Sequence, residues 1–166
     1  KNLPEMKLEQ IASCQTSKEC YTQGNEEFNQ GQYERAEALF KRATSLAPPG
    51  KIKAILLYNM GCTSLLVNKG EKASEYFKKS GNTDSLNMLG IMYYFGVHPE
   101  GQSRQRALDY FLITSNKCSV LGCIYIGNMY YDGTHPEGQS YEKASEKGPM
   151  SFLHVTSLLC VSAPLR

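Results

Sequence analysis

Histidine and glutamate recur together in the second half of the sequence. The hexapeptide His-Pro-Glu-Gly-Gln-Ser occupies residues 98–103 and again residues 135–140. If the two segments lie in adjacent loops, four side chains could hold a metal ion through nitrogen and oxygen: His98, Glu100, His135 and Glu137. The alternative is a turn in each loop, since proline fixes φ and glycine supplies a positive φ. We favour the turns and predict no metal, because a duplication explains the repetition without a ligand.

The sequence carries no catalytic signature. It contains no G-x-S-x-G, no Walker phosphate loop, no H-E-x-x-H and no G-x-G-x-x-G. Its six cysteines form no C-x-x-C pair, and the separation of Cys14 from Cys20 matches no common zinc pattern. We interpret the cysteines as reduced core thiols of a cytoplasmic protein, although a chain that starts at Lys1 leaves a removed leader open. The sequence predicts a non-enzymatic protein without a cofactor.

The composition is that of an ordinary globular chain. Of 166 residues, 41% are hydrophobic and 20% are charged. No apolar run of about 18 residues is present, so no membrane is expected as a partner. The net charge of +2 is too small to make nucleic acid the expected partner either.

The most informative pattern is internal repetition. At an offset of 37 residues, the segment 90–94 aligns with 127–131, as the two hexapeptides do. The segment 71–75 is identical to the segment 142–146. A period in the thirties with helical apolar spacing is typical of stacked helical hairpins. We therefore predict an all-α fold.

Each repeat unit has a glycine early in its first helix and an alanine in its second, which let the two helices approach closely. These residues are Gly24 and Ala36, Gly61 and Ala73, Gly90 and Ala107, and Gly127 and Ala144. The distances from glycine to alanine are 12, 12, 17 and 17 residues. The first two hairpins are therefore expected to have tight turns, at Gly31 and around Lys69 and Gly70. The last two carry five extra residues, which contain the hexapeptide.

The first unit resembles a tetratricopeptide repeat (TPR). The residues that carry this resemblance are Gly24, Asn25, Phe28, Gly31, Tyr33, Ala36, Phe40, Ala43 and Pro48. The third and fourth units resemble the Sel-one-like branch of the same superfamily, through the segments 89–93 and 96–97 with Ala107 and their counterparts in the fourth unit. The resemblance implies a right-handed α-α superhelix whose first helices line a concave surface. Such proteins commonly assemble protein complexes.

Helices are expected near 18–30, 33–46, 54–67, 70–80, 84–95, 103–115, 119–132 and 140–146. The predicted organisation is an N-terminal segment or short helix over 1–16, two TPR-like repeats over 17–80, and two Sel-one-like repeats over 81–147. In the last repeat, Lys147 and Gly148 stand where the second repeat has its aromatic pair, Tyr76 and Phe77, and Gly148 with Pro149 is expected to stop the helix. The segment 148–166 is an atypical tail, and the uncapped end of the stack could pair with a second copy.

The predicted concave face is rich in aromatic and amide side chains. It comprises Tyr21, Asn25, Phe28, Asn29, Tyr58, Asn59, Asn87, Tyr94, Phe95, Tyr125, Asn128 and Tyr131. Asparagine both donates to and accepts from a peptide backbone, and tyrosine offers a large contact area at low entropic cost. We predict a scaffold or adaptor that holds an extended peptide or a helix of a protein partner in this groove.

Other binding modes fit the residues less well. Chaperone-binding TPR domains clamp an acidic C-terminal tail with lysine, arginine and asparagine. Asn25 and Asn59 occupy the asparagine positions, but Tyr21 stands at a lysine position, and Asp84 and Met88 stand where the third unit would need cations. A helical-repeat RNA-binding module and a targeting module of a larger enzyme complex stay as alternatives.

Overall fold

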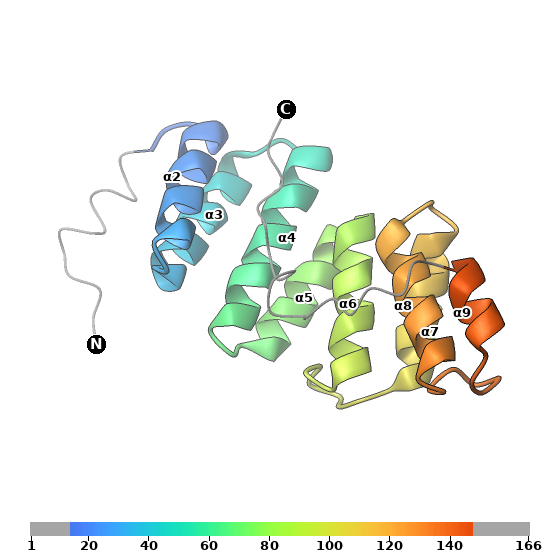
Figure 1. Cartoon of the computed structure of the whole chain (residues 1–166). Coiled ribbons are helices and arrows are strands. Elements are labelled where there is room, and N and C mark those ends of the chain that lie inside the picture. The colour runs from blue at the N-terminus through green and yellow to red at the C-terminus, as the bar shows by residue number, and fades with distance from the viewer. Residues whose placement is uncertain (1–13, 148–166) are drawn as a thin grey trace. The chain divides into compact units, whose positions relative to one another are not determined.

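The computed structural model describes residues 14–147, and every regular element in that range is an α-helix (Figure 1). The helices are α2 (Ser17–Asn29), α3 (Tyr33–Leu46), α4 (Lys51–Leu66), α5 (Gly70–Ser80), α6 (Thr83–Phe95), α7 (Arg104–Ser115), α8 (Val120–Tyr131) and α9 (Tyr141–Lys147). The all-α prediction is confirmed, and the largest difference in a boundary is at α4, which begins at Lys51 instead of residue 54.

Consecutive helices pack as hairpins within two compact units. The helices of residues 14–80 form the first unit, with contacts of α2 to α3, α3 to α4 and α4 to α5. The helices of residues 81–147 form the second, with the same succession of contacts from α6 to α9. A chain of nearest-neighbour hairpin contacts is the architecture of a helical repeat protein.

One packing contact recurs in three hairpins. A glycine of the first helix faces a phenylalanine of the second, in the pairs Gly24 with Phe40, Gly61 with Phe77 and Gly90 with Phe111. A Cβ atom added at these glycines would lie 2.6, 2.4 and 2.6 Å from the ring Cε1 atom. All three rings are at most 1% exposed, and the predicted alanines Ala36, Ala73, Ala107 and Ala144 are fully buried. The small residues thus give the second helix its close approach, as the sequence predicts.

The turns of the first unit are short. Gly31 has φ +74° between α2 and α3, as expected for a turn that needs a left-handed residue. Between α4 and α5, that conformation is taken by Asn68, with φ 58°, and Gly70 already begins the helix. The turn therefore lies one or two residues before its expected position, because asparagine also tolerates the left-handed region.

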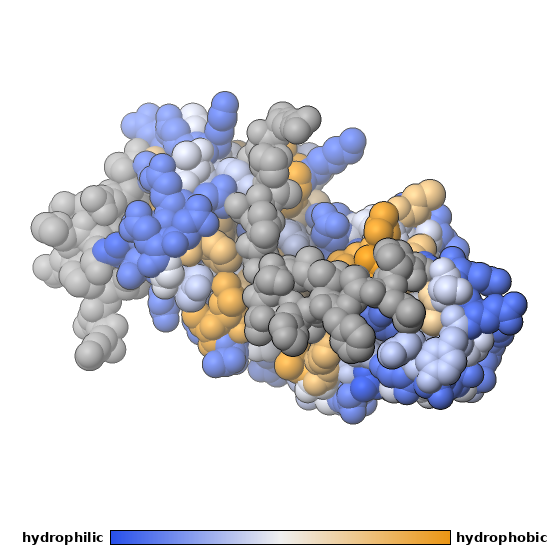
Figure 2. Space-filling view, in the orientation of Figure 1, coloured by the Kyte–Doolittle hydropathy of each residue, from blue (hydrophilic) through white to orange (hydrophobic). Residues whose placement is uncertain are grey.

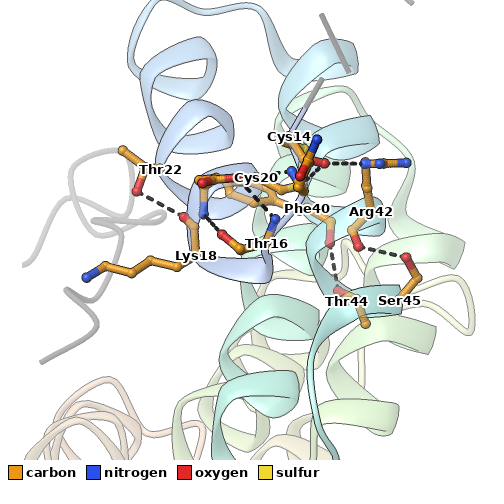
Figure 3. The surroundings of a disulfide bond; sticks show 11 residues. Cys14, Thr16, Lys18, Cys20, Thr22, Phe40, Arg42, Thr44 and Ser45 are labelled. Carbon is orange, nitrogen blue, oxygen red and sulfur yellow. Dashed lines mark hydrogen bonds between the residues drawn. A yellow bond between two sulfur atoms is a disulfide. The ribbon is translucent and has the colours of Figure 1, made fainter. Parts of the chain in front are cut away.

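The six cysteines are not all reduced thiols. Cys14 and Cys20 form a disulfide with Cα atoms 5.3 Å apart, and both residues are at most 2% exposed (Figure 3). The expectation of six reduced thiols is therefore wrong. The pairing arises because the chain before α2 folds back over the first turn of that helix, a geometry that the sequence separation alone does not reveal. Cys118 and Cys123 are free thiols.

The segment around the disulfide is tied down by polar contacts as well (Figure 3). Thr16 caps α2: its hydroxyl accepts the Glu19 N–H at 3.2 Å, while the Glu19 carboxylate accepts the Thr16 N–H at 3.1 Å. From α3, the Arg42 Nε atom donates to the carbonyl oxygen of Cys14 at 2.9 Å. The start of the first hairpin is thus joined covalently to α2 and by a hydrogen bond to α3.

Two predictions concern segments outside the described residues. These are the short N-terminal helix, expected over residues 3–15, and the tail over residues 148–166. Within residues 14–147, no helix is both long enough and apolar enough to cross a bilayer.

Candidate functional site

In the first unit, the predicted face lies on α2 and α4, and its tyrosines pack against the buried phenylalanines. The Tyr21 ring centroid is 5.9 Å from that of Phe40, and the Tyr58 centroid is 6.0 Å from that of Phe77. Tyr21 is only 5% exposed, whereas Tyr58 is partly exposed. Tyr21 therefore belongs mainly to the hairpin core, and Tyr58 shares its ring between the core and the surface.

The amides of the first unit differ in accessibility. Asn29 is exposed and Asn25 is partly exposed near the middle of α2, whereas Asn59 on α4 is 4% exposed. Phe28, also on α2, is partly buried and meets Tyr33 edge-on, with centroids 5.5 Å apart. The groups of this unit that a partner could reach are consequently at Asn25, Phe28, Asn29 and Tyr58.

In the second unit, four rings form an aromatic cluster, which we define as Tyr94, Phe95, Phe111 and Tyr125. The Tyr94 centroid lies 4.9 Å from Phe95 and 5.7 Å from Tyr125, and Tyr125 stacks on Phe111 at 4.7 Å. Tyr94 and Tyr125 are 8% and 5% exposed, but Phe95 is 45% exposed. The structure therefore brings three predicted residues together, with Phe95 as the ring that reaches the surface.

Charged groups surround Tyr94. Its hydroxyl donates to the Asp132 Oδ2 atom at 2.5 Å, and the Arg104 guanidinium lies 3.9 Å from its ring centroid. Burial, followed by the hydrogen bond to the Asp132 carboxylate, raises the pKa of Tyr94 to about 12. Burial also raises the pKa of Tyr125 to about 12. Both phenols are thus protonated at neutral pH, and Tyr94 acts as a donor to Asp132.

The other predicted residues of this unit are placed differently. Asn87 is 1% exposed, and its Nδ2 atom donates to the Ser119 hydroxyl, the N-cap of α8, at 2.9 Å. Asn128 and Tyr131 on α8 are partly exposed, and the Tyr131 ring meets Tyr141 of α9 edge-on at 5.4 Å. Asn87 therefore joins two helices of the hairpin stack instead of facing a partner.

Apolar side chains also reach the surface outside the predicted face. Figure 2 shows them beside the turn between α7 and α8, whereas hydrophilic residues dominate over α9. Three exposed residues near this turn are Leu112, Ile113 and Val120, at 44%, 45% and 70%. Because Leu112 is as exposed as Phe95, it offers a matched comparison for any binding test.

The two hexapeptide loops have one geometry. In each, a glycine adopts positive φ, +81° at Gly101 and +82° at Gly138, as predicted for a turn. The histidine Nδ1 atom accepts a backbone N–H at 3.1 Å, from Glu100 in one loop and from Glu137 in the other. Among residues 14–147, no group of three or more His, Cys, Asp or Glu side chains is arranged to hold a metal ion.

Comparison with known families decides the nature of the first hairpin. The tetratricopeptide repeat model matches residues 17–49, which span α2, α3 and the turn between them. This hairpin is a tetratricopeptide repeat. TPR hairpins generally mediate protein–protein interactions. A search of curated proteins finds no match to the chain.

The TPR hairpin supplies a reference for the others. Its Gly24–Phe40 contact recurs in the hairpins of α4 and α5 and of α6 and α7. The sequence identified the glycines but not the phenylalanines as their partners. It also did not predict that Arg104 and Asp132 would contact Tyr94. A constant spacing could have revealed the phenylalanines, because Phe40 and Phe77 each follow their glycine by 16 residues, and Phe111 follows by 21, the same five-residue excess as in the loop.

Proposed function

We propose that the chain is a non-enzymatic scaffold or adaptor that binds a peptide or a helix of a protein partner on the exposed faces of its first helices. The TPR hairpin supports a protein-binding role, since such repeats generally serve it. The observation that carries the proposal is Phe95, a large ring that is 45% exposed although it packs against the rings of Tyr94 and Tyr125. A rigid aromatic anchor of this kind is typical of binding hot spots.

Amide side chains reach the surface in each unit. Asn25 and Asn29 on α2 and Asn128 on α8 are at least partly exposed. The side chains of Asn29 and Asn128 can pair with the donors and acceptors of an extended backbone, whereas the Oδ1 atom of Asn25 is buried. We further propose that the hairpins of residues 81–147 are Sel-one-like repeats, because both have a lengthened turn and the hairpin of α6 and α7 keeps the glycine–phenylalanine contact. The sequence-based cytoplasmic location is weakened by the Cys14–Cys20 disulfide, which favours an oxidising compartment.

The test is affinity capture with a matched pair of variants. Phe95→Ala removes the exposed ring of α6, and Leu112→Ala removes a side chain of equal exposure, 44% against 45%, on the second helix of the same hairpin. Both variants should keep the circular dichroism of the wild type. We expect Phe95→Ala to lose captured proteins that Leu112→Ala retains. Retention by both variants, or loss only with Leu112→Ala, would contradict binding at this face.

A further inference from the structure

The two hexapeptide loops, residues 98–103 and 135–140, each bury a histidine against a tyrosine of the preceding helix. His98 is 4% exposed and stacks on Tyr93 with centroids 3.9 Å apart and an interplanar angle of 20°. His135 is 9% exposed and stacks on Tyr130 at 3.8 Å and 21°. The same arrangement thus occurs twice, at positions 37 residues apart.

The hydrogen bond to each ring fixes its protonation state. A backbone N–H can only donate, so the Nδ1 atom that receives the Glu100 or Glu137 N–H must carry a lone pair. The proton of each ring is therefore on Nε2, and the imidazole is neutral. A second proton would go to Nδ1, where it would face another donor, and the bond that closes the turn would break.

The rest of each loop depends on the same turn. The histidine carbonyl accepts the glycine N–H three residues later at 2.8 Å, at Gly101 and at Gly138. The serine that ends the hexapeptide donates its N–H to the backbone carbonyl oxygen of the stacked tyrosine. The distance is 3.1 Å from Ser103 to Tyr93 and 2.9 Å from Ser140 to Tyr130. Opening the turn at the histidine would therefore loosen the attachment of the loop to the last turn of α6 or α8.

Charged groups lie near both histidine rings, and those around His135 shift its pKa in opposite directions. Around His135, the loop contributes Glu137 and α9 contributes Lys143, while the Tyr130 hydroxyl of α8 donates to Glu137 at 2.9 Å. Burial lowers the pKa of His135, Lys143 lowers it further, and Glu137 opposes them. Around His98, the loop contributes Glu100, α6 contributes Tyr93, and α7 contributes Arg106, which pairs with Glu100, and Tyr110.

We propose that these loops form an acid-sensitive device, in which protonation of His98 and His135 opens both turns and loosens the hairpins of residues 81–147. The sign follows from the neutral folded state. A histidine that must be neutral when folded contributes stability above its unfolded pKa, near 6.5, and that stability is lost as the pH falls through the lower folded value. The unit of residues 14–80 contains no histidine, so it lacks this response.

The first experiment is ¹⁵N NMR of the histidine ring nitrogens in the full chain, with His154→Gln to leave two rings. We expect both rings to be Nε2–H tautomers at pH 7.5, with titration midpoints below 6.5. A ring that carries its proton on Nδ1, or a midpoint at or above 6.5, would overturn the proposal. This measurement needs no loop variant to fold.

The second experiment follows amide hydrogen exchange at pH 7.5 and pH 5.0, corrected for intrinsic rates. We expect protection of the Glu100 and Glu137 amides to fall about tenfold per unit of pH below the folded pKa. In the double variant His98→Asn and His135→Asn, the side-chain amide oxygen replaces Nδ1 as acceptor but does not titrate. Protection of the Glu100 and Glu137 amides should therefore be the same at the two pH values. The Gln32 amide of the first unit serves as an internal control. Equal protection of the wild-type loops at both pH values would overturn the proposal.

Discussion

The turn between α2 and α3 has three residues, 30–32, whereas the turn between α6 and α7 has eight, 96–103. The helices on either side nevertheless pack in the same way. A Cβ atom added at Gly24 would meet Phe40 at 2.6 Å, and one added at Gly90 would meet Phe111 at the same distance. The contact between the helices is therefore set by the glycine–phenylalanine pair and not by the connection. The five additional residues are free to form a structure of their own, the histidine loop.

The N-termini of the helices are capped differently in the two units. In the second unit, Asn82, Ser103 and Ser119 each accept a backbone N–H at the N-cap of α6, α7 and α8. In the first unit, Thr16 caps α2 in this way, but the N-cap residues of α3 and α4, Gln32 and Gly50, make no side-chain cap. The first unit instead has a covalent link at its N-terminal end, the Cys14–Cys20 disulfide.

The largest loss in the free energy of unfolding is expected at the glycine–phenylalanine contact, which occurs in both units. Phe40→Ala and Phe111→Ala each empty a site beside a helix glycine, and each should lower the free energy of unfolding by about 3–5 kcal/mol. Urea denaturation followed by circular dichroism measures the loss. Phe95→Ala, which removes an exposed ring, should cost less than about 1 kcal/mol and serves as the control. If only one of the two core variants were destabilised, the hairpins would not share one packing principle.

A smaller loss in the free energy of unfolding is expected from removing the disulfide of the first unit. Replacing Cys14 and Cys20 by serine together removes a short covalent loop, which should lower the free energy of unfolding by about 2 kcal/mol. Hydrogen exchange should place the loss in α2 and α3, since Arg42 also holds this segment. The matched control replaces the free thiols Cys118 and Cys123 by serine, with an expected change within about 0.5 kcal/mol.

The disulfide has a second, independent readout. Alkylation of the unfolded, unreduced chain followed by mass spectrometry should label Cys118 and Cys123 but leave Cys14 and Cys20 unlabelled. Labelling of all four would contradict the pairing. It would also restore the sequence-based expectation of reduced thiols at these positions.

The features that could be predicted are those set by local sequence patterns, and the features that were missed depend on side chains that meet only in the folded chain. The helices and the small residues were predictable because apolar periodicity and repeated glycines are local in the sequence. The pairing of Cys14 with Cys20 was not, because it depends on the backbone path before α2. The burial of Asn87 was not predictable either, since it follows from a hydrogen bond to Ser119, 32 residues away. Side-chain partners across a hairpin can be identified only from the packed structure, whereas the hairpins themselves can be predicted from the sequence.

The smallest loss in the free energy of unfolding is expected at the residue that precedes the second helix of a hairpin. This residue differs between the two units. Ser103 caps α7 by accepting the Arg106 N–H at 3.3 Å, whereas Gln32 makes no side-chain cap at α3. Ser103→Ala should therefore lower the free energy of unfolding by about 1 kcal/mol. Gln32→Ala should leave it unchanged within about 0.5 kcal/mol. Equal losses in urea denaturation would mean that the capping difference between the units has no energetic consequence, and that the longer loop stabilises α7 without the serine hydroxyl.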